Sequence, residues 1–431
     1  MLVLLAAQLV QQRGRLGSRN NWWTDQYGYY AYLPQFILRQ DPHGHEPAGF
    51  QDERAFMKEA PRGRVNQYPP GVALHLLPFF AVAHAAAHLL HHPTDGYGPI
   101  YRAVVGLAPL CYVACALLLL RAWLRRFFVD ATLVWVLPTL VLATNLFYYV
   151  VVAGLMAHAY LFFLFSAILY LTPRWYEEGR PWQALALGAL VGWAVVTRYT
   201  AGVVALVPLL YGLSPGAPLR ERLGWWWKRR RQVAAALATM AVPILLLMSY
   251  WHLNTGQFFY HSYGAQGLIF DRRPPLLAGL FSARNGWLLY TPVMAPALLG
   301  LWWLRRTHPE WFRPLVIFLV VNLYLVLSWH VWFYKGFGQR ALIESYAPLA
   351  LPLALTYDRL ARGGVTRWLA RLFLVTCVGL NLFQSYQFQR GLINGDRMSW
   401  AAYRLTFGRL SLTPSEEEAF EEHLHPEPDY Q

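Results

Sequence analysis

Asp25 is a lone carboxylate in an aromatic segment near the start of the chain, with Trp22, Trp23 and Tyr29 among its neighbours. A carboxylate that aromatic rings partly shield from water is suited to remove a proton from a hydroxyl group, as a general base does. The same rings, including Tyr29, present flat faces on which a sugar can stack. A simple helix N-cap just after Thr24 is the alternative interpretation of Asp25.

Arg198 is the first candidate for binding an anion. It lies between two short apolar runs, 183–196 and 201–213, so we expect it at a turn near a membrane surface. A guanidinium at headgroup depth can bind a lipid phosphate through two parallel hydrogen bonds. Snorkelling of a long side chain into the ordinary headgroup region is the alternative.

Lys335, Arg340 and Glu344 form a second charged group, next to a turn that Gly336 and Gly338 permit. Arg340 and Glu344 are four residues apart and would share one face of an α-helix. Glu344 would then fix Arg340 and leave guanidinium donors for a ligand anion. A purely structural ion pair is equally compatible with this spacing.

The histidines His84, His88, His91 and His92 have a helical spacing that a metal ion can use. No carboxylate of fixed geometry accompanies them, so an interfacial helix with a titratable face is the better interpretation. The three cysteines all lie in apolar runs, which argues against a disulfide framework or a zinc site. The sequence predicts no required cofactor, and it leaves the use of a divalent metal undecided.

Composition places these residues in a membrane protein. The chain has 431 residues, of which 56% are hydrophobic and 14% are charged, whereas soluble domains carry about 25% charged residues. Many of its apolar runs approach the roughly 20 residues that span a bilayer as a helix. With a short apolar segment at the N-terminus, eleven spans are expected, the other ten being 102–124, 131–152, 154–172, 183–197, 200–213, 233–252, 287–304, 314–330, 341–357 and 368–388.

The positive charge predicts the orientation of these spans. If Pro69–Leu90 lies along the interface and does not cross, five basic loops share one face of the membrane. These loops hold 18 Lys and Arg against 6 Asp and Glu, which accounts for +12 of the formal charge of +14, and they are 121–130, 173–182, 214–232, 305–313 and 358–371. Basic loops remain on the cytoplasmic side. The N-terminus is then inside and the C-terminus outside, and nucleic acid is not needed to explain the charge.

The predicted fold is therefore all-α: a polytopic membrane protein of about eleven transmembrane helices. A single transmembrane domain is expected over residues 1–390. Its large first outer loop, about residues 11–101, would carry juxtamembrane helices. An outer tail, 391–431, is acidic at its end.

Five segments in order resemble the GT-C membrane glycosyltransferases, the superfamily of protein O-mannosyltransferases and lipid A aminoarabinose transferases. Thr24 to Pro34 is similar to the acidic motif of the first loop in bacterial members, and Asn66 to Gly71 to their Pro-Pro juxtamembrane motif. Thr197 to Thr200 holds Arg198 where relatives have a basic residue after a short span. Gly286 to Pro292 and Phe337 to Arg340 resemble later family segments.

This resemblance implies eleven to thirteen helices, a large first outer loop and inverting transfer from a polyprenyl-phosphate sugar. By carry-over, Asp25 would be the base that activates the acceptor, and Arg198 would contact the lipid phosphate, with Arg340 a weaker candidate for the same anion. Tyr68, in the Pro-Pro motif, and His158, in Met156-Ala157-His158, are further candidate substrate contacts.

Two departures from the family are visible. Gln67 stands where relatives often have lysine, which removes an expected phosphate contact. Ala153 and Gly154 precede the His158 segment where many relatives have an acid, so His158 lacks a carboxylate partner and a metal-binding role is in doubt.

The function predicted is transfer of a sugar from a polyprenyl phosphate to a lipid or cell-surface glycan. The site would face the outside of a bacterial-type inner membrane, and the partners would be the glycosyl lipid, the acceptor and membrane lipids. Lipid-linked glycan flippases or transporters, glycan polymerases or ligases and non-catalytic lipid-binding relatives are the alternatives.

Overall fold

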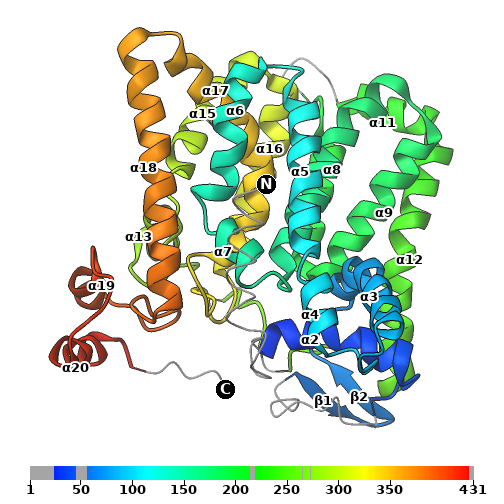
Figure 1. The fold of residues 1–431 in the computed structure, drawn as a ribbon. Coiled ribbons are helices and arrows are strands. Elements are labelled where there is room, and N and C mark those ends of the chain that lie inside the picture. The colour runs from blue at the N-terminus through cyan, green and yellow to red at the C-terminus, as the bar shows by residue number, and fades with distance from the viewer. Residues whose placement is uncertain (1–23, 45–55, 214–218, 265, 272, 427–431) are drawn as a thin grey trace. The chain divides into compact units, whose positions relative to one another are not determined.

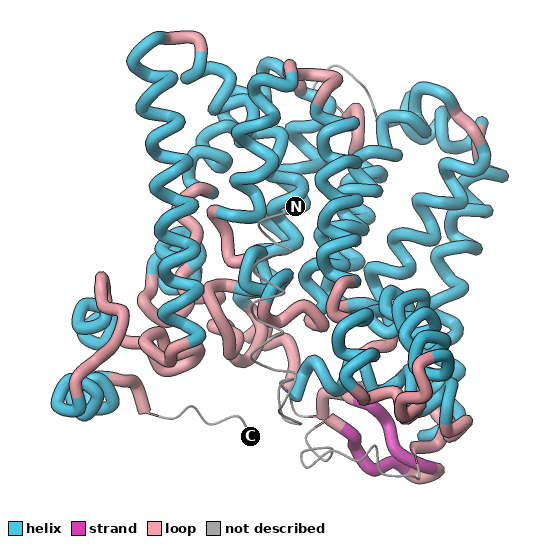
Figure 2. The backbone as a smooth tube through the Cα atoms, viewed as in Figure 1, coloured by secondary structure: helices cyan, strands magenta, loops and turns pink. Residues whose placement is uncertain are grey.

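The computed structural model describes residues 24–44, 56–213, 219–264, 266–271 and 273–426. These residues are mostly helical, and their only named strands form a two-stranded hairpin (Figure 2). By its internal contacts the chain separates into two compact units. The first comprises residues 1–118, 149–205 and 220–264, and the second comprises 119–148, 206–219 and 265–431.

The first unit contains the hairpin and the helices around it (Figure 1). The strands β1 and β2 are antiparallel, with Ala60 paired to Gly63 across a two-residue turn. The elements of this unit are α2 (Thr24–Leu33), a π-helix (Pro34–Leu38), β1 (Met57–Ala60), β2 (Gly63–Asn66), α3 (Gly71–Leu89), α4 (Pro99–Val105), most of α5 (Ala108–Leu124), α8 (Ala157–Glu178), α9 (Pro181–Thr197), a 3-10 helix (Tyr199–Ala205), α11 (Leu219–Lys228) and α12 (Arg230–Thr255).

Two glycines bring α9 and α12 into close contact. A Cβ atom added at Gly188 would lie 1.9 Å from the carbonyl oxygen of Ala236, and one added at Gly192 would lie 2.3 Å from that of Met240. Glycines four residues apart lie on one face of a helix and let a second backbone approach closely, as in GxxxG pairs. The Thr239 hydroxyl adds a hydrogen bond of 2.9 Å to the carbonyl of Leu185.

The two ends of the first unit differ in character. At one end, Gln232 at the start of α12 donates to the carbonyl of Gly179 at 2.7 Å, so loop 173–182 and the described part of loop 214–232 meet there, as the charge pattern predicts. At the other end, Asn254 near the last residue of α12 accepts from the backbone N–H of Arg62 in the hairpin turn at 2.9 Å. The hairpin therefore lies about 39 Å away from the basic loops, the length of a 26-residue helix.

The described residues of the second unit form helices, connecting loops and one isolated antiparallel bridge between Leu268 and Trp329. Its core contains α15 packed on α17, and α6 packed on both α17 and α18. The elements are α6 (Asp130–Leu142), α7 (Leu146–Val151, which begins in this unit), α10 (Leu206–Leu210), α13 (Leu276–Phe281), α14 (Trp287–Tyr290), α15 (Met294–Thr307), α16 (Pro309–Leu327), a 3-10 helix (Arg340–Ser345), α17 (Tyr346–Ala361), α18 (Gly364–Gln389), α19 (Trp400–Thr406) and α20 (Pro414–His423).

The basic loops of the second unit also share one end. The Thr132 hydroxyl, in the first turn of α6, bonds Asp358 at 3.2 Å, and the guanidinium of Arg359 lies 5.2 Å from the ring centroid of Trp303. The ring of Phe127 contacts that of His308 at 4.7 Å. Loops 121–130, 305–313 and 358–371 therefore gather as the positive-inside pattern predicts.

Five helices among the described residues are long and apolar enough to cross a membrane, judged by length and composition. They are Gly71–Leu89, Pro99–Leu124, Arg230–Thr255, Pro309–Leu327 and Gly364–Gln389. Four coincide with expected spans, whereas the first is the segment expected to lie along the interface. Its position along the interface, and the total of eleven spans, remain predictions, and the short N-terminal segment lies outside the described residues.

Several expected spans are interrupted. The run 131–152 breaks between α6 and α7, where the Thr144 hydroxyl bonds the carbonyl of Leu140 at 2.7 Å. The run 287–304 breaks near Pro292, because proline has no N–H for the helical ladder. The run 341–357 begins as a 3-10 helix. Hydropathy alone registers none of these breaks.

The expected division into a domain over 1–390 and a tail over 391–431 remains a prediction. Within the described part of that tail, the structure has two helices, α19 and α20. Thr413 caps α20 through a capping box with Glu416, which fits the acidic first turn of that helix.

The α9–α12 contact generates a stability prediction. Replacing Gly188 with Ile forces the two backbones apart, and overpacking of this kind costs about 1–3 kcal/mol. We expect a lower thermal unfolding midpoint for Gly188→Ile in detergent. Gly379→Ile, in α18, is the matched control because nothing lies within 4 Å of an added Cβ there. Equal losses in the two variants would contradict the packing described.

Candidate functional site

Asp25 and Tyr68 form a short hydrogen bond at the hairpin end of the first unit. The Tyr68 hydroxyl lies 2.5 Å from Oδ1 of Asp25, in the first turn of α2. Burial, followed by the negative charge of Asp25, raises the pKa of Tyr68 well above its ordinary value. The phenol therefore remains protonated and donates, and the carboxylate accepts. The aromatic and Pro-Pro segments predicted from the sequence are thus in direct contact.

Asn66 holds Tyr68 in this position. Its side-chain amide donates to the carbonyl of Gly28 on α2 at 2.7 Å, and its Oδ1 accepts from the backbone N–H of Tyr68 at 3.0 Å. Its own backbone N–H donates to the hydroxyl of Tyr250 on α12 at 3.0 Å. One buried residue therefore links α2, the segment before α3 and α12 through its side chain and its backbone N–H.

Gly28 leaves the space that the Tyr68 ring occupies. A Cβ atom added at Gly28 would lie 2.3 Å from Cδ2 and 2.7 Å from Cε2 of Tyr68. The ring of Tyr29 contacts Tyr68 from another side, with centroids 4.7 Å apart. The Tyr32 hydroxyl donates to the carbonyl of Tyr68 at 2.7 Å. The position of the phenol is therefore determined by contacts on several sides.

Tyr263 connects Asp25 with Arg198. Its ring meets that of Tyr68 edge to face, with centroids 6.1 Å apart. Burial raises the pKa of Tyr263 well above its ordinary value, the Asp25 carboxylate adds to the increase, and the Arg198 guanidinium opposes it. Tyr68 bonds Asp25, and Tyr199, which directly follows Arg198, has its ring 6.3 Å from that of Tyr263, so contacts between aromatic rings link the two charged residues.

Arg198 reaches this end because α9 stops there. The helix ends at Thr197, and Arg198 has an extended backbone with φ of −159°. A Cβ atom added at Gly71 would lie 2.4 Å from the backbone nitrogen of Thr197, so the start of α3 lies directly against this turn. Trp193 donates to the carbonyl of Gly71 at 3.1 Å. The turn expected at Arg198 is therefore present.

Further aromatic side chains pack around Tyr199, next to Arg198. The Tyr199 ring lies 6.0 Å from that of Trp251 and 6.3 Å from that of Tyr263, and its hydroxyl is 3.4 Å from Ser262 Oγ. Ser262 donates to the carbonyl of Gln67 at 2.8 Å. Sequence reasoning missed Ser262 and Tyr263, and no local pattern in their loop marks them.

Tyr29 and His158, which were predicted to contact the substrate, are mainly buried. Tyr29 is 7% exposed and packs on Tyr68, so its position supports the Asp25–Tyr68 pair. His158 is 5% exposed at the start of α8, and its ring lies 4.9 Å from that of Tyr149. Direct contact of either side chain with a substrate remains a prediction.

A metal centre is not evident in the described part of the chain, where no group of three or more His, Cys, Asp or Glu side chains is placed to hold an ion. The His84 and His88 rings are 4.8 Å apart, and Nδ1 of His84 lies 2.5 Å from the Tyr101 hydroxyl.

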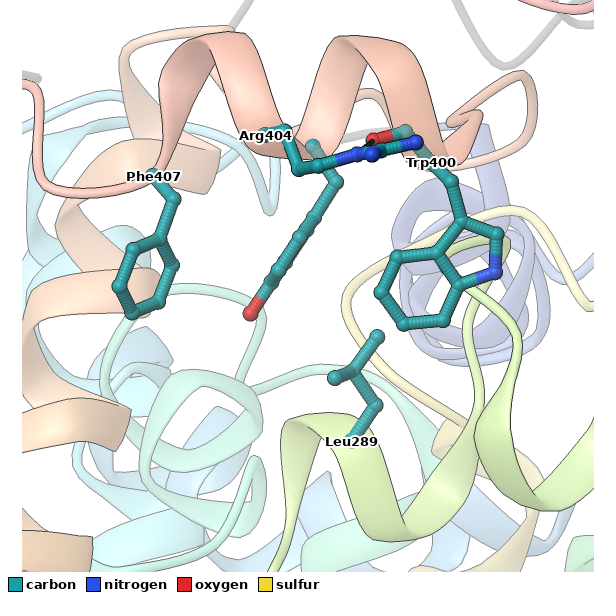
Figure 3. A pocket seen from close by; sticks show the side chains of 5 residues that line it. Leu289, Trp400, Arg404 and Phe407 are labelled. Atoms are coloured by element: carbon teal, nitrogen blue, oxygen red, sulfur yellow. Dashed lines mark hydrogen bonds between the residues drawn. The ribbon is translucent and has the colours of Figure 1, made fainter.

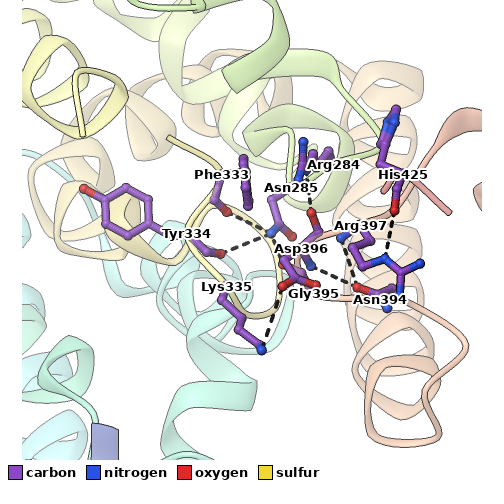
Figure 4. A network of polar contacts seen from close by, with 10 residues as sticks. All are labelled: Arg284, Asn285, Phe333, Tyr334, Lys335, Asn394, Gly395, Asp396, Arg397 and His425. Atoms are coloured by element: carbon purple, nitrogen blue, oxygen red, sulfur yellow. Dashed lines mark hydrogen bonds and ion pairs between the residues drawn. The ribbon is translucent and has the colours of Figure 1, made fainter. Parts of the chain in front are cut away.

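The remaining predicted residues belong to the second unit, and one of them, Lys335, lies in the network of loop contacts shown in Figure 4. Asn285 donates through its amide to the carbonyls of Phe333, Tyr334 and Gly395. Lys335 is 73% exposed and lies 3.8 Å from the carboxylate of Asp396. Lys335 is therefore paired with an acid within its own unit.

Arg340 and Glu344 do not lie on a common α-helical face. Residues Arg340–Ser345 form a 3-10 helix, in which positions three apart share a face. Glu344 is only 2% exposed, whereas Arg340 is partly exposed. The expected α-helical geometry is therefore wrong for this segment, whereas the ion pair between these two residues and their ligand contacts remain predictions.

A cavity of about 610 Å³ opens on the second unit (Figure 3). It is lined by Leu289, Trp400, Tyr403, Arg404 and Phe407. The Arg404 side chain runs along α19, where its Nε donates to the carbonyl of Trp400 at 3.2 Å. None of the predicted site residues lines this cavity.

Comparisons with known proteins add little to these observations. No protein-family model matches the chain, and no curated protein matches it. Among solved structures, the chain is similar to the apo form of an oligosaccharyltransferase from Archaeoglobus fulgidus, with 13% sequence identity and a TM-score of 0.46. The match covers 99% of this chain and 60% of that protein. The function proposed below follows from the side chains rather than from this likeness.

The fit between Gly28 and Tyr68 generates a prediction. Gly28→Ala places a methyl group where the Tyr68 ring lies, at a cost of about 1–3 kcal/mol in the free energy of unfolding. In a Tyr68→Ala background the same change should cost little, because the ring is gone. A double-mutant cycle of thermal unfolding measures the difference. An equal cost in both backgrounds would show that Tyr68 does not occupy this space.

Proposed function

We propose that this chain is a membrane glycosyltransferase that moves a sugar from a polyprenyl phosphate to a hydroxyl of a lipid or cell-surface glycan. The observation that carries the proposal is the Asp25 carboxylate, held by Tyr68 at 2.5 Å, with Arg198 directly before Tyr199, whose ring lies 6.3 Å from that of Tyr263 in the same cluster of phenols. The resemblance of the five sequence segments to the GT-C superfamily supports it.

Each charged group has one role in the proposed reaction. Asp25 takes the proton from the acceptor hydroxyl as that oxygen attacks the anomeric carbon. The bond between this carbon and the phosphate oxygen breaks on the opposite face of the sugar, which inverts the configuration. Arg198 stabilises the phosphate that departs with the polyprenyl chain, because a guanidinium binds phosphate oxygens in pairs. Tyr68 orients the carboxylate.

The location of the site supports an outer-face enzyme of a bacterial-type inner membrane. In the first unit, Asp25 and the basic loops lie at opposite ends of α12, a helix long enough to span a bilayer. Because basic loops remain in the cytoplasm, the Asp25 end faces outward. A lipid phosphate at headgroup depth would meet Arg198 there. The proposed partners are the glycosyl lipid, its acceptor and the surrounding lipids, and the proposed reaction requires no cofactor.

The role of Asp25 generates a prediction for cells that lack the gene. Such cells should accumulate one polyprenyl-phosphate sugar, which the wild-type protein clears and Asp25→Asn does not. The amide is nearly isosteric but cannot accept the proton, so we expect a loss of at least about hundredfold in transfer. Mass spectrometry of extracted lipids measures this loss and identifies the donor.

Asp271→Asn is the matched control, since Asp271 is an exposed carboxylate in a loop of the second unit. It should clear the lipid as the wild type does. Clearance by Asp25→Asn at the wild-type rate would remove Asp25 as the base, and a flippase or a lipid-binding protein would then explain the structure better.

The role of Arg198 generates a separate prediction for transfer by the purified protein. Arg198→Gln should raise KM for the glycosyl lipid about ten- to hundredfold, since a hydrogen bond to a charged group contributes about 1.5–3 kcal/mol. Arg198→Lys should lie between this variant and the wild type, because it keeps the charge but loses the planar fork. Arg273→Gln, at an exposed loop position, should change little. An unchanged KM in Arg198→Gln would exclude this phosphate contact.

A further inference from the structure

The helix α11 combines aromatic and basic residues immediately before the membrane-length helix α12. Residues 219–231 contain six Lys or Arg and one Glu. The helix α12 that follows has a mean hydropathy of 2.0 over its most apolar window. A short basic helix next to a span lies at headgroup depth if the span crosses.

One side of α11 is fixed to the end of α8. The Trp225 ring stacks on that of Tyr176 with centroids 4.5 Å apart, and it meets Trp175 edge to face at 5.1 Å. Trp226 donates from its indole N–H to the Tyr176 hydroxyl at 3.2 Å. Arg222 lies 4.4 Å from the centre of the same Tyr176 ring. The orientation of α11 on the first unit is therefore set by specific contacts.

The other side of α11 is exposed and amphipathic. Trp227 is 72% exposed and Leu223 is 51% exposed, so two large apolar side chains face outward. Exposed cations surround them, namely Arg220, Lys228, Arg230 and Arg231. In the described part of the chain, no ion pair joins these four side chains to an acid.

We propose that α11 is a binding surface for anionic phospholipid headgroups. Trp227 and Leu223 would enter the boundary between headgroups and acyl chains, where indole rings are favoured. Lys228, Arg230 and Arg231 would contact lipid phosphates, since basic clusters beside a membrane helix attract anionic lipids. The binding requires no reaction at Asp25, so it is independent of the proposed transfer.

The charges favour a lipid over a soluble partner. The cations lie within a few residues of the first turn of α12, so they are confined to the depth at which phosphates of the leaflet lie. The neighbouring loop adds Arg174 and Arg180 at the same end of the unit, of which Arg180 is paired with Glu178 at 3.0 Å. An exposed tryptophan among cations is the composition of an interfacial helix.

Native mass spectrometry of the full-length protein tests the proposal. The protein is kept in micelles doped with either phosphatidylglycerol or phosphatidylcholine, and the lipid that it retains is measured. The wild type should retain phosphatidylglycerol in preference. The variant Lys228→Gln/Arg230→Gln/Arg231→Gln should lose about tenfold or more of that preference, as expected when three basic contacts are removed. Trp227→Ser alone should weaken retention of both lipids. This single variant tests the proposal if the triple variant does not fold.

The matched control removes three exposed cations from another basic loop, as Arg305→Gln/Arg306→Gln/Arg313→Gln. It should keep most of the preference. Equal losses in the two triple variants would overturn the proposal, because the effect would then be one of net charge. A wild-type protein with no preference, or one whose bound lipid is displaced by inorganic phosphate at the concentration of the lipid, would overturn it as well.

Discussion

The hydrogen bonds of Asn66 are the constraint on which the candidate site depends. Its side chain bonds the carbonyl of Gly28 and the backbone N–H of Tyr68, while its own backbone N–H reaches Tyr250 on α12. A buried amide must satisfy its donors and acceptors within the protein, because unpaired polar groups away from water are costly. The three segments can therefore meet in few other arrangements. As a consequence, the Tyr68 hydroxyl lies next to the Asp25 carboxylate. Position 28 must be glycine because the Tyr68 ring occupies the space that a Cβ atom would need.

The distribution of charge indicates how the site is oriented relative to the basic loops. In each unit taken alone, the basic loops gather at one end, and the predicted site residues lie away from that end. The separation within the first unit is set by α12, whose length matches a bilayer. A carboxylate and an arginine near phenols, at the end away from the basic loops, are suited to the lipid phosphate and the hydroxyl of the proposed transfer. The amphipathic surface of α11 lies at the basic end and suits anionic lipid headgroups.

Much of this arrangement could be predicted from the sequence, because hydropathy and charge act along the whole chain. Both patterns predicted which loops gather, and the aromatic segment at Asp25, the Pro-Pro segment and the turn at Arg198 were recognised as candidates that belong together. The contacts that join them could not be predicted, since Asn66 and Tyr250 are 184 residues apart, and Ser262 and Gln67 are 195 apart. The 3-10 helix at Arg340 could not be predicted, because residue spacing alone does not distinguish it from an α-helix. The glycine pair at positions 188 and 192 is visible in the sequence, but its partner helix is not.

The most direct test of the account is a cryo-electron microscopy map of the full-length protein in lipid nanodiscs with a polyprenyl phosphate bound. The account predicts phosphate density within hydrogen-bonding distance of the Arg198 guanidinium, with the side that would carry the sugar facing the Asp25 carboxylate and the Tyr68 hydroxyl. Phosphate density against Lys335 and Arg340 in the second unit, with none beside Arg198, would contradict it.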